Sequence, residues 1–326
     1  MKKSLVILLC FVMVISAMLV GCSGENTPAT LKFGAGVYVS APSATDATED
    51  KDGSGKIDVT VAAVTVDANG KIVACALDTA SNTVKFTADG KAVAVDSFKT
   101  KYELGADYGM KSPYGSAKEW NEHADAFKNV VKGKTLDEVK ALVVDGNKGN
   151  DEVVAAGCTI MINEFVGAIE KAYAAAVDSN VTANDTLKVT VATEQTCTDA
   201  TEDKDGSNKV STTVFASAVD ANGKIVAASS DCVEVAFTFT TAGASTLDTT
   251  KAVLSKKQQG DNYGMKSPYG SAKEWYDHAA AFDAACIGKT PAEVAGLMAE
   301  DGKGVDTLKA AGCTIYITGF VKAASK

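Results

Sequence analysis

Two identical tripeptides, Gly157-Cys158-Thr159 and Gly312-Cys313-Thr314, are the parts of this chain best suited to chemistry. In each, a hydroxyl follows a glycine and a small residue, just before a short apolar run. A glycine lets the backbone approach a bulky group, and backbone N–H groups in such a loop can bind a phosphate. The pattern predicts either a phosphate-binding loop or an ordinary tight loop that enters a buried strand, Thr159–Ile162 in the first copy.

A second group of candidates combines aromatic rings with methionine. Its members occur twice at one spacing: Tyr108, Met110, Tyr114 and Trp120, then Tyr263, Met265, Tyr269 and Trp275. Such side chains most often fill gaps in a core. The alternative is that they form a wall against a planar ligand. The sequence favours the core role and leaves the wall open.

Metal binding and hydrolysis have little support. His123 and His278 are the only histidines, and neither has a Cys or His partner at metal-ligand spacing. No serine or cysteine motif accompanies them, so we assign no catalytic residue and expect these histidines to pack or to lie on a helix surface. The loop around Asp50 lacks the first and twelfth ligands of a calcium-binding EF-hand, because Thr48 and Val59 stand there.

These candidates belong to a duplicated unit. The thirteen residues from Tyr108 to Trp120 recur without change from Tyr263 to Trp275. The repeat distance is that of a domain rather than of a solenoid. We therefore predict two tandem domains, residues 31–178 and 186–326, joined by a linker at 179–185.

Each unit has the pattern of an α+β domain, in which an antiparallel, hairpin-based sheet packs against helices. Apolar runs flank Asn69-Gly70 and Asn222-Gly223, which predicts hairpins of residues 57–77 and 210–229. Further strands are expected at 83–87, 92–95 and 233–240. Capping boxes that begin at Ser116 and Thr135, with copies at Ser271 and Thr290, predict two helices per unit. Residues 164–176 and 319–324 predict a closing helix.

The N-terminus predicts export. Lys2 and Lys3 precede an apolar run that ends at Cys22, as in a secretory signal peptide at residues 1–21. The alternative is an uncleaved membrane anchor. Leu19-Val20-Gly21-Cys22 resembles the bacterial lipobox, which implies that Cys22 is lipidated and that 22–30 is a tether. We expect a lipid-anchored protein on the extracytoplasmic face of the cell membrane.

Composition limits the partners. The chain of 326 residues has a net charge of −9 and contains no Arg, the side chain best suited to phosphate and base recognition. An acidic chain of this kind is a poor nucleic-acid binder, and it lacks a basic face for anionic lipids. The cysteines do not follow the repeat as a disulfide framework would, although a bridge between Cys197 and Cys232 is possible.

The order of these motifs resembles the FMN-binding domain family. The shared features are the hairpin, the Tyr-Gly-Met-Lys…Glu-Trp segment, the Gly-Lys-Thr turn and the closing Gly-small-Thr-Ile sequence. The nearest resemblance is to the duplicated flavin-carrying lipoproteins of Gram-positive extracellular electron transfer. It implies FMN joined by a flavin transferase to Thr159 and Thr314, with Gly157, Gly312, Cys158 and Cys313 in the attachment loop. It also implies electron transfer from a membrane donor to an extracellular acceptor, with Tyr108, Met110, Tyr263 and Met265 near the flavin.

Two hypotheses remain open. The first is the flavin carrier just described, in which FMN is covalently attached or bound without a bond. The second is a non-enzymatic surface module that keeps the fold and binds a small ligand or a partner protein. It is motivated by Val153 and Leu308, which stand where the family's attachment motif has Asp.

Overall fold

The computed structural model describes residues 29–111, 115–266 and 270–326. The predicted signal peptide, Cys22 and most of the predicted tether lie outside these residues. So do Tyr114, Tyr269 and the Ser112-Pro113 part of the predicted turn.

Two antiparallel sheets form the centre of the protein. The first has the strand order β4-β3-β2-β1-β5 and the second has the order β6-β7-β8. The strands are β1 (Thr30–Thr45), β2 (Gly53–Val66), β3 (Ile72–Phe86), β4 (Ala92–Val93), β5 (Val177–Thr182), β6 (Thr186–Thr198), β7 (Gly206–Val219) and β8 (Ile225–Phe239). Both predicted Asn-Gly hairpins are present, between β2 and β3 and between β7 and β8.

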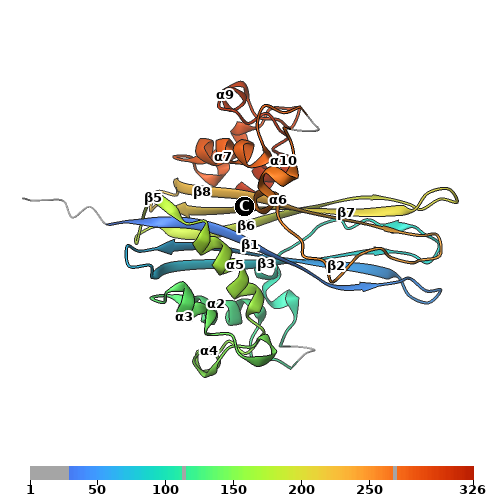
Figure 1. Ribbon diagram of the computed structural model, residues 1–326, viewed down its shortest axis with the longest axis horizontal. Helices are drawn as coiled ribbons and strands as arrows, with labels where there is room; N and C mark the ends of the chain where they lie inside the picture. The colour runs from blue at the N-terminus through green and yellow to red at the C-terminus, as the bar shows by residue number, and fades with distance from the viewer. Residues whose placement is uncertain (1–28, 112–114, 267–269) are drawn as a thin grey trace, which may run out of the picture.

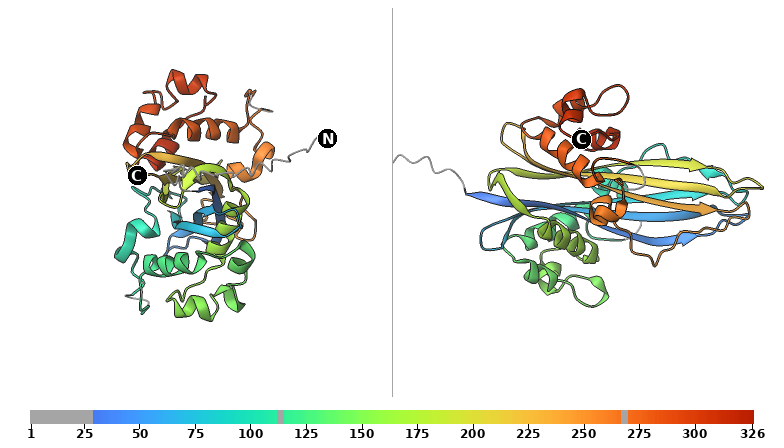
Figure 2. Two further views of the ribbon diagram at one scale, coloured as in Figure 1. Left: turned by 90° about the vertical axis from the view of Figure 1, so that its left-hand side faces the viewer. Right: turned by 45° about the horizontal axis from the view of Figure 1, so that its top comes forward.

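Helices cover the outer face of each sheet, so the molecule has four layers, helix–sheet–sheet–helix (Figures 1 and 2). The first half contributes α1 (Lys101–Leu104), α2 (Trp120–Val131), α3 (Leu136–Lys140), α4 (Asp151–Ala155) and α5 (Asn163–Ala174). The second contributes α6 (Lys256–Gln259), α7 (Trp275–Cys286), α8 (Pro291–Val294), α9 (Asp306–Ala310) and α10 (Thr318–Ala324). Short 3-10 turns are η1 (Gly105–Tyr108), η2 (Asp145–Asn147), η3 (Gly260–Tyr263) and η4 (Ala295–Leu297). The predicted α+β class is confirmed.

The two sheets pack face to face and share one core. Val59 of β2, Val84 of β3, Val210 of β7 and Phe237 of β8 belong to the same buried cluster. A strand covered on both faces should be apolar along its length rather than alternating. Accordingly, every residue of β2 from Ile57 to Val66 is buried. The two halves are therefore one packed body and not two domains on a flexible connection.

The contacts between halves repeat about an approximate two-fold relation. β3 packs against β6, and β8 packs against β1. Lys171 Nζ donates to Gln258 Oε1 at 3.4 Å, and Lys326 Nζ donates to Glu103 Oε1 at 2.6 Å. Lys171 and Lys326 occupy matching places in the repeat, as do Glu103 and Gln258. The same surface of each half thus contacts the other half, as in the isologous interface of a symmetric dimer.

Three sequence predictions about elements were wrong. Residues 83–87 and 233–240 continue the preceding strands and do not form separate ones, because the buried polar residues Asp78 and Asp231 interrupt the apolar pattern without interrupting the ladder. The stretch 179–185 joins the halves but begins within β5, which pairs with β1. Residues 159–162 form no strand, since Thr159 is exposed and Met161 is 62% exposed.

The start of α2 also differs from expectation. The N-cap is Glu119, which forms a capping box with Glu122, and α7 begins likewise at Glu274 with Asp277. Ser116, predicted as the cap, binds other partners described below. The boxes at Thr135 and Thr290 are confirmed, as is the buried face of Trp120, Ala124, Phe127 and Val131.

Candidate functional site: a repeated pocket beside Gly-Cys-Thr

A cavity of about 560 Å³ opens in the first half between the sheet and the helices. Tyr108, Met110 and Trp120 line it, together with Lys101 and Ile160. Tyr108 and Met110, expected mainly as core residues, are thus only partly buried and form a wall. Trp120 serves both purposes, because it is 3% exposed and its ring meets Phe165 edge-on at a centroid distance of 5.6 Å.

The second half has a matching cavity of about 320 Å³. It is lined by Lys256, Tyr263, Met265, Trp275, Ile315 and Tyr316. Each of these six residues occupies the repeat position of a residue that lines the first cavity, and Tyr316 corresponds to Met161. Six of the eight residues of the aromatic and methionine group thus line cavities, and the other two, Tyr114 and Tyr269, lie outside the described residues.

Sequence reasoning missed a lysine in each cavity. Lys101 Nζ lies 5.2 Å from the ring centroid of Tyr108 and 5.4 Å from that of Trp120. Lys256 Nζ has the same relation to Tyr263 and Trp275, at 4.9 and 5.5 Å. Burial lowers the pKa of Lys101. The signal was available, since both lysines precede the repeated segment by the same interval, but their neighbours differ in sequence.

The two Gly-Cys-Thr tripeptides end helices. Gly157 has a φ of 98° and Gly312 a φ of 107°, a region that favours glycine. Gly157 N donates to Val154 O at 2.9 Å and Cys158 N donates to Val153 O at 3.0 Å. These bonds form a Schellman cap of α4, and the same pair of bonds caps α9. The predicted cradle of free N–H groups is therefore wrong at these glycines and cysteines, because the helix carbonyls already bind them.

Beyond the cap, the hydroxyl-bearing residue reaches the surface. Cys158 and Cys313 are buried, whereas Thr159 and Thr314 are exposed. The next residue, Ile160 or Ile315, lines the cavity. Each threonine thus lies one residue from the pocket without forming its wall.

His123 connects the repeated segment to this loop. Its Nδ1 lies 3.1 Å from Gly157 O and 3.3 Å from Thr159 N, and its Nε2 lies 3.1 Å from Ser116 Oγ. His123 is 1% exposed, and burial lowers its pKa. The expected packing role is confirmed, and it includes polar contacts that the sequence did not predict.

His278 repeats the arrangement. Its Nδ1 lies 2.7 Å from Gly312 O and 3.3 Å from Thr314 N, and its Nε2 lies 3.2 Å from Ser271 Oγ. In both halves the serine expected as a helix cap instead holds the histidine. The recurrence indicates that the repeated segment positions the Gly-Cys-Thr loop.

The cavities differ in their polar groups. Glu164 lies in the first cavity, where its carboxylate accepts a hydrogen bond from Ser40 Oγ at 2.7 Å. The matching position in the second half is Gly319, so that carboxylate is missing there. In the second half Glu234 pairs instead with Lys256, at 3.2 Å.

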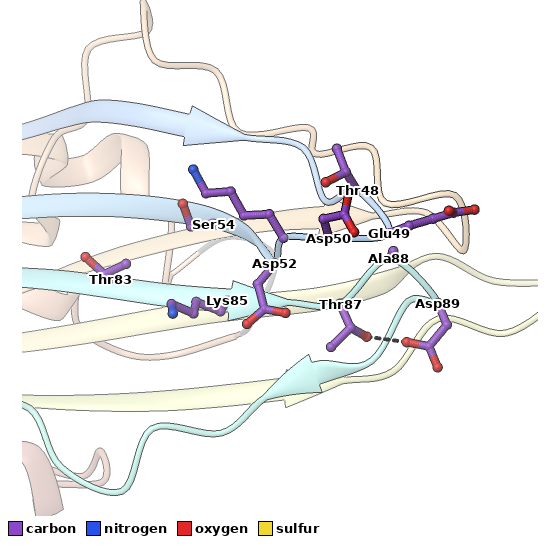
Figure 3. A pocket seen from close by; sticks show the side chains of 11 residues that line it. Thr48, Glu49, Asp50, Asp52, Ser54, Thr83, Lys85, Thr87, Ala88 and Asp89 are labelled. Carbon is purple, nitrogen blue, oxygen red and sulfur yellow. Dashed lines mark hydrogen bonds between the residues drawn. The ribbon is translucent and has the colours of Figure 1, made fainter.

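A third cavity, of about 630 Å³, lies at the ends of the strands (Figure 3). It is lined mainly by charged and small polar residues of the loops after β1 and β3 and of the adjoining parts of β2 and β3, with no aromatic ring. In Figure 3 the carboxylates of Glu49, Asp52 and Asp89 point in different directions rather than toward one centre. Within the described residues, no group of three or more His, Cys, Asp or Glu side chains could hold a metal ion.

Six cysteines of the described chain are free thiols. The possible bridge between Cys197 and Cys232 is absent, because these residues lie on β6 and β8 with β7 between them. Burial raises the pKa of Cys232 to about 11 and that of Cys313 to about 11. Such thiols are poor nucleophiles.

Comparisons with other proteins leave the family unassigned. No family model matches the chain, and neither the curated proteins nor the solved structures gave a match. Among the described helices, none is long and apolar enough to cross a membrane.

Proposed function

We propose that this protein is a lipid-anchored surface protein that carries FMN and takes part in electron transfer between a membrane donor and an extracellular acceptor. One observation carries the proposal. In each half, a pocket with Tyr, Trp and Met walls lies one residue from an exposed threonine on a loop held by a buried histidine. A ligand with a planar ring and a phosphate at one end would fit, with its ring in the pocket and its phosphate at the threonine.

The residues present fit such a ligand. Cavities of about 560 and 320 Å³ fall within the usual range for small-molecule sites. Tyr108, Met110 and Trp120 offer flat or deformable apolar surface to a ring. Lys101 places a positive charge in this cavity, which would favour the anionic reduced form of a flavin bound there. A bound flavin would supply the redox chemistry, and the protein would set its position and exposure.

Thr159 and Thr314 are the proposed points at which the phosphate end is held, by a phosphoester when a flavin transferase has acted. The test is the protein purified from its own host. We expect a yellow protein with a flavin-phosphate mass on the peptides that contain Thr159 and Thr314. Thr159→Ala should remove the first modified peptide and leave the second, which serves as the internal control. A colourless protein of unmodified mass that also fails to bind added FMN would refute the proposal.

A second candidate is a non-enzymatic surface module that keeps the fold and binds another small ligand or a partner protein. The observation in its favour concerns Val153 and Leu308, at the position of the family's Asp. These side chains are 0% and 2% exposed and sit in the last turns of α4 and α9, where a transferase could not contact them. Unmodified threonines in host-purified protein that binds neither FMN nor riboflavin would favour this candidate, and tight, stoichiometric binding of FMN would count against it.

A further inference from the structure

A lysine ammonium lies against each Gly-Cys-Thr loop. A Cβ built on Gly157 would be 2.0 Å from Lys118 Nζ, and one built on Gly312 would be 2.0 Å from Lys273 Nζ. The ammonium thus occupies the space that any other side chain would need. Both lysines belong to the repeated segment, three residues after the invariant Gly115 and Gly270.

The backbone of this lysine is fixed by the same serine that holds the histidine. Lys118 N donates to Ser116 Oγ at 3.2 Å, and Ser116 Oγ lies 2.7 Å from Lys118 O. Lys273 and Ser271 repeat both distances, 3.2 and 2.7 Å. The buried N-cap glutamate follows directly in each half. The placement over the loop is therefore built by the fold and occurs twice.

Neither ammonium has a carboxylate partner within 4.0 Å in the part of the chain that the structure describes. The ion pairs of the described residues include the neighbouring Lys111, which contacts Glu122 at 2.6 Å, but not Lys118 or Lys273. Each lysine is only half-buried, so its charge is accessible from solvent. The exposed hydroxyl of Thr159 or Thr314 lies two residues beyond the glycine that the ammonium covers.

An ammonium held against a loop that carries an exposed threonine two residues further on is suited to bind a phosphate monoester. The glycine and cysteine N–H groups of the loop are used by the Schellman caps, so the lysine supplies the charge that those groups do not. We infer that Lys118 and Lys273 bind the phosphate of the ligand whose ring occupies the adjacent pocket, and thereby select phosphorylated over unphosphorylated ligands. This inference rests on the proposed function for the identity of the ring.

The test compares FMN with riboflavin, which differ only by the phosphate. The full chain, produced in a host without a flavin transferase, is titrated with each ligand and followed by flavin fluorescence. A charge-assisted contact contributes about 1.5–3 kcal/mol, so we expect FMN to bind at least about tenfold more tightly than riboflavin. Lys118→Met with Lys273→Met should remove that preference and leave riboflavin affinity unchanged.

Two further variants make the result specific. Lys118→Arg with Lys273→Arg keeps the charge and should keep most of the preference. Lys132→Met removes one exposed charge at the other end of α2 and should leave the preference intact. Equal affinities of the wild type for FMN and riboflavin, or an unchanged preference for FMN in the double Met variant, would overturn the inference. Neither result would contradict flavin binding in the pocket.

Inorganic phosphate separates the remaining outcomes. If neither flavin binds, the proposed function fails. Phosphate binding at the lysine site is then tested separately, by following the amide chemical shifts of Gly157 and Thr159 by NMR during a titration with inorganic phosphate. Shifts in the wild type that are absent from the double Met variant would support the lysine site alone. No shift in the wild type would overturn it as well.

Discussion

His123→Ala removes the side chain that links the repeated segment to the Gly-Cys-Thr loop. The ring nitrogens lose partners at 3.1 Å on Ser116 and 3.1 Å on Gly157. Loss of the bond to Ser116 costs about 1 kcal/mol, and leaving the partly buried Gly157 carbonyl without its donor costs about 1–3 kcal/mol. We expect His123→Ala to lower the free energy of unfolding by about 3 kcal/mol, a large share of the stability of an ordinary domain.

Urea denaturation followed by circular dichroism measures this loss. His278→Ala is the matched variant and should cost a similar amount, because its contacts repeat those of His123. Asn129→Ala, on the exposed face of α2, is the control and should change stability by less than about 0.5 kcal/mol. His123→Asn keeps an N–H donor near Gly157 O and should recover about 1 kcal/mol of the loss.

The same side chain predicts a pH dependence. Burial lowers the folded-state pKa of His123, so the unfolded chain takes up a proton first as the pH falls below about 6.5. Wild-type stability relative to His123→Asn should therefore decrease as the pH falls from about 6.5 toward the folded-state pKa, and level off below it. A loss of less than about 1 kcal/mol in His123→Ala, or an increase in relative stability on acidification, would refute the role given to His123.

Three further variants test other parts of the structure. Gly157→Ala forces a non-glycine residue to a φ of 98° and should cost about 1–3 kcal/mol in urea denaturation, whereas Gly296→Ala, which has open space around it, should be near neutral. Burial raises the pKa of Asp78 to about 6, so the native state holds this proton more tightly than the unfolded chain does. Asp78→Asn should therefore gain stability relative to wild type as the pH rises from about 4 to about 6. A difference in unfolding free energy between the two proteins that stays constant over this range would show that Asp78 does not titrate there. In a chain that lacks residues 1–28, Cys197 is the one cysteine of the described residues that is not buried, so Cys197→Ser should abolish rapid reaction with a thiol reagent. Rapid reaction that persists in Cys197→Ser would mean that the buried thiols are accessible.

Local sequence predicted most of the elements. Asn-Gly turns fixed both hairpins, and the Thr-x-x-Glu boxes fixed the starts of α3 and α8, because these signals act within a few residues of the chain. The predictions of local structure were wrong where a contact with a residue distant in sequence replaced the local interaction. Ser116 has the spacing of a helix cap, yet its hydroxyl binds His123, and the cap moves to Glu119.

The Gly-Cys-Thr loop shows a second kind of error. Its glycine and small residue were correctly chosen as special, but a Schellman cap and a phosphate cradle require the same residue types. Only the observed bonds from Gly157 and Cys158 to α4 distinguish them. The position of the Lys118 ammonium over the loop could not be found from the sequence, because Lys118 lies 39 residues before Gly157 along the chain.

The sequence by itself determined that this protein consists of two like units, each with a hairpin, an apolar helix face and a Gly-Cys-Thr site. Those properties follow from identity between repeats and from short-range turn, capping and periodicity rules. Only the tertiary structure decided that the two sheets share one core, and that Tyr108, Met110 and Trp120 of the repeated segment line a pocket. Whether a strand is buried on both faces depends on which other elements pack against it in the fold. A residue that lines a pocket differs from a core residue only because one side of it contacts no protein atoms, and that depends on the tertiary structure.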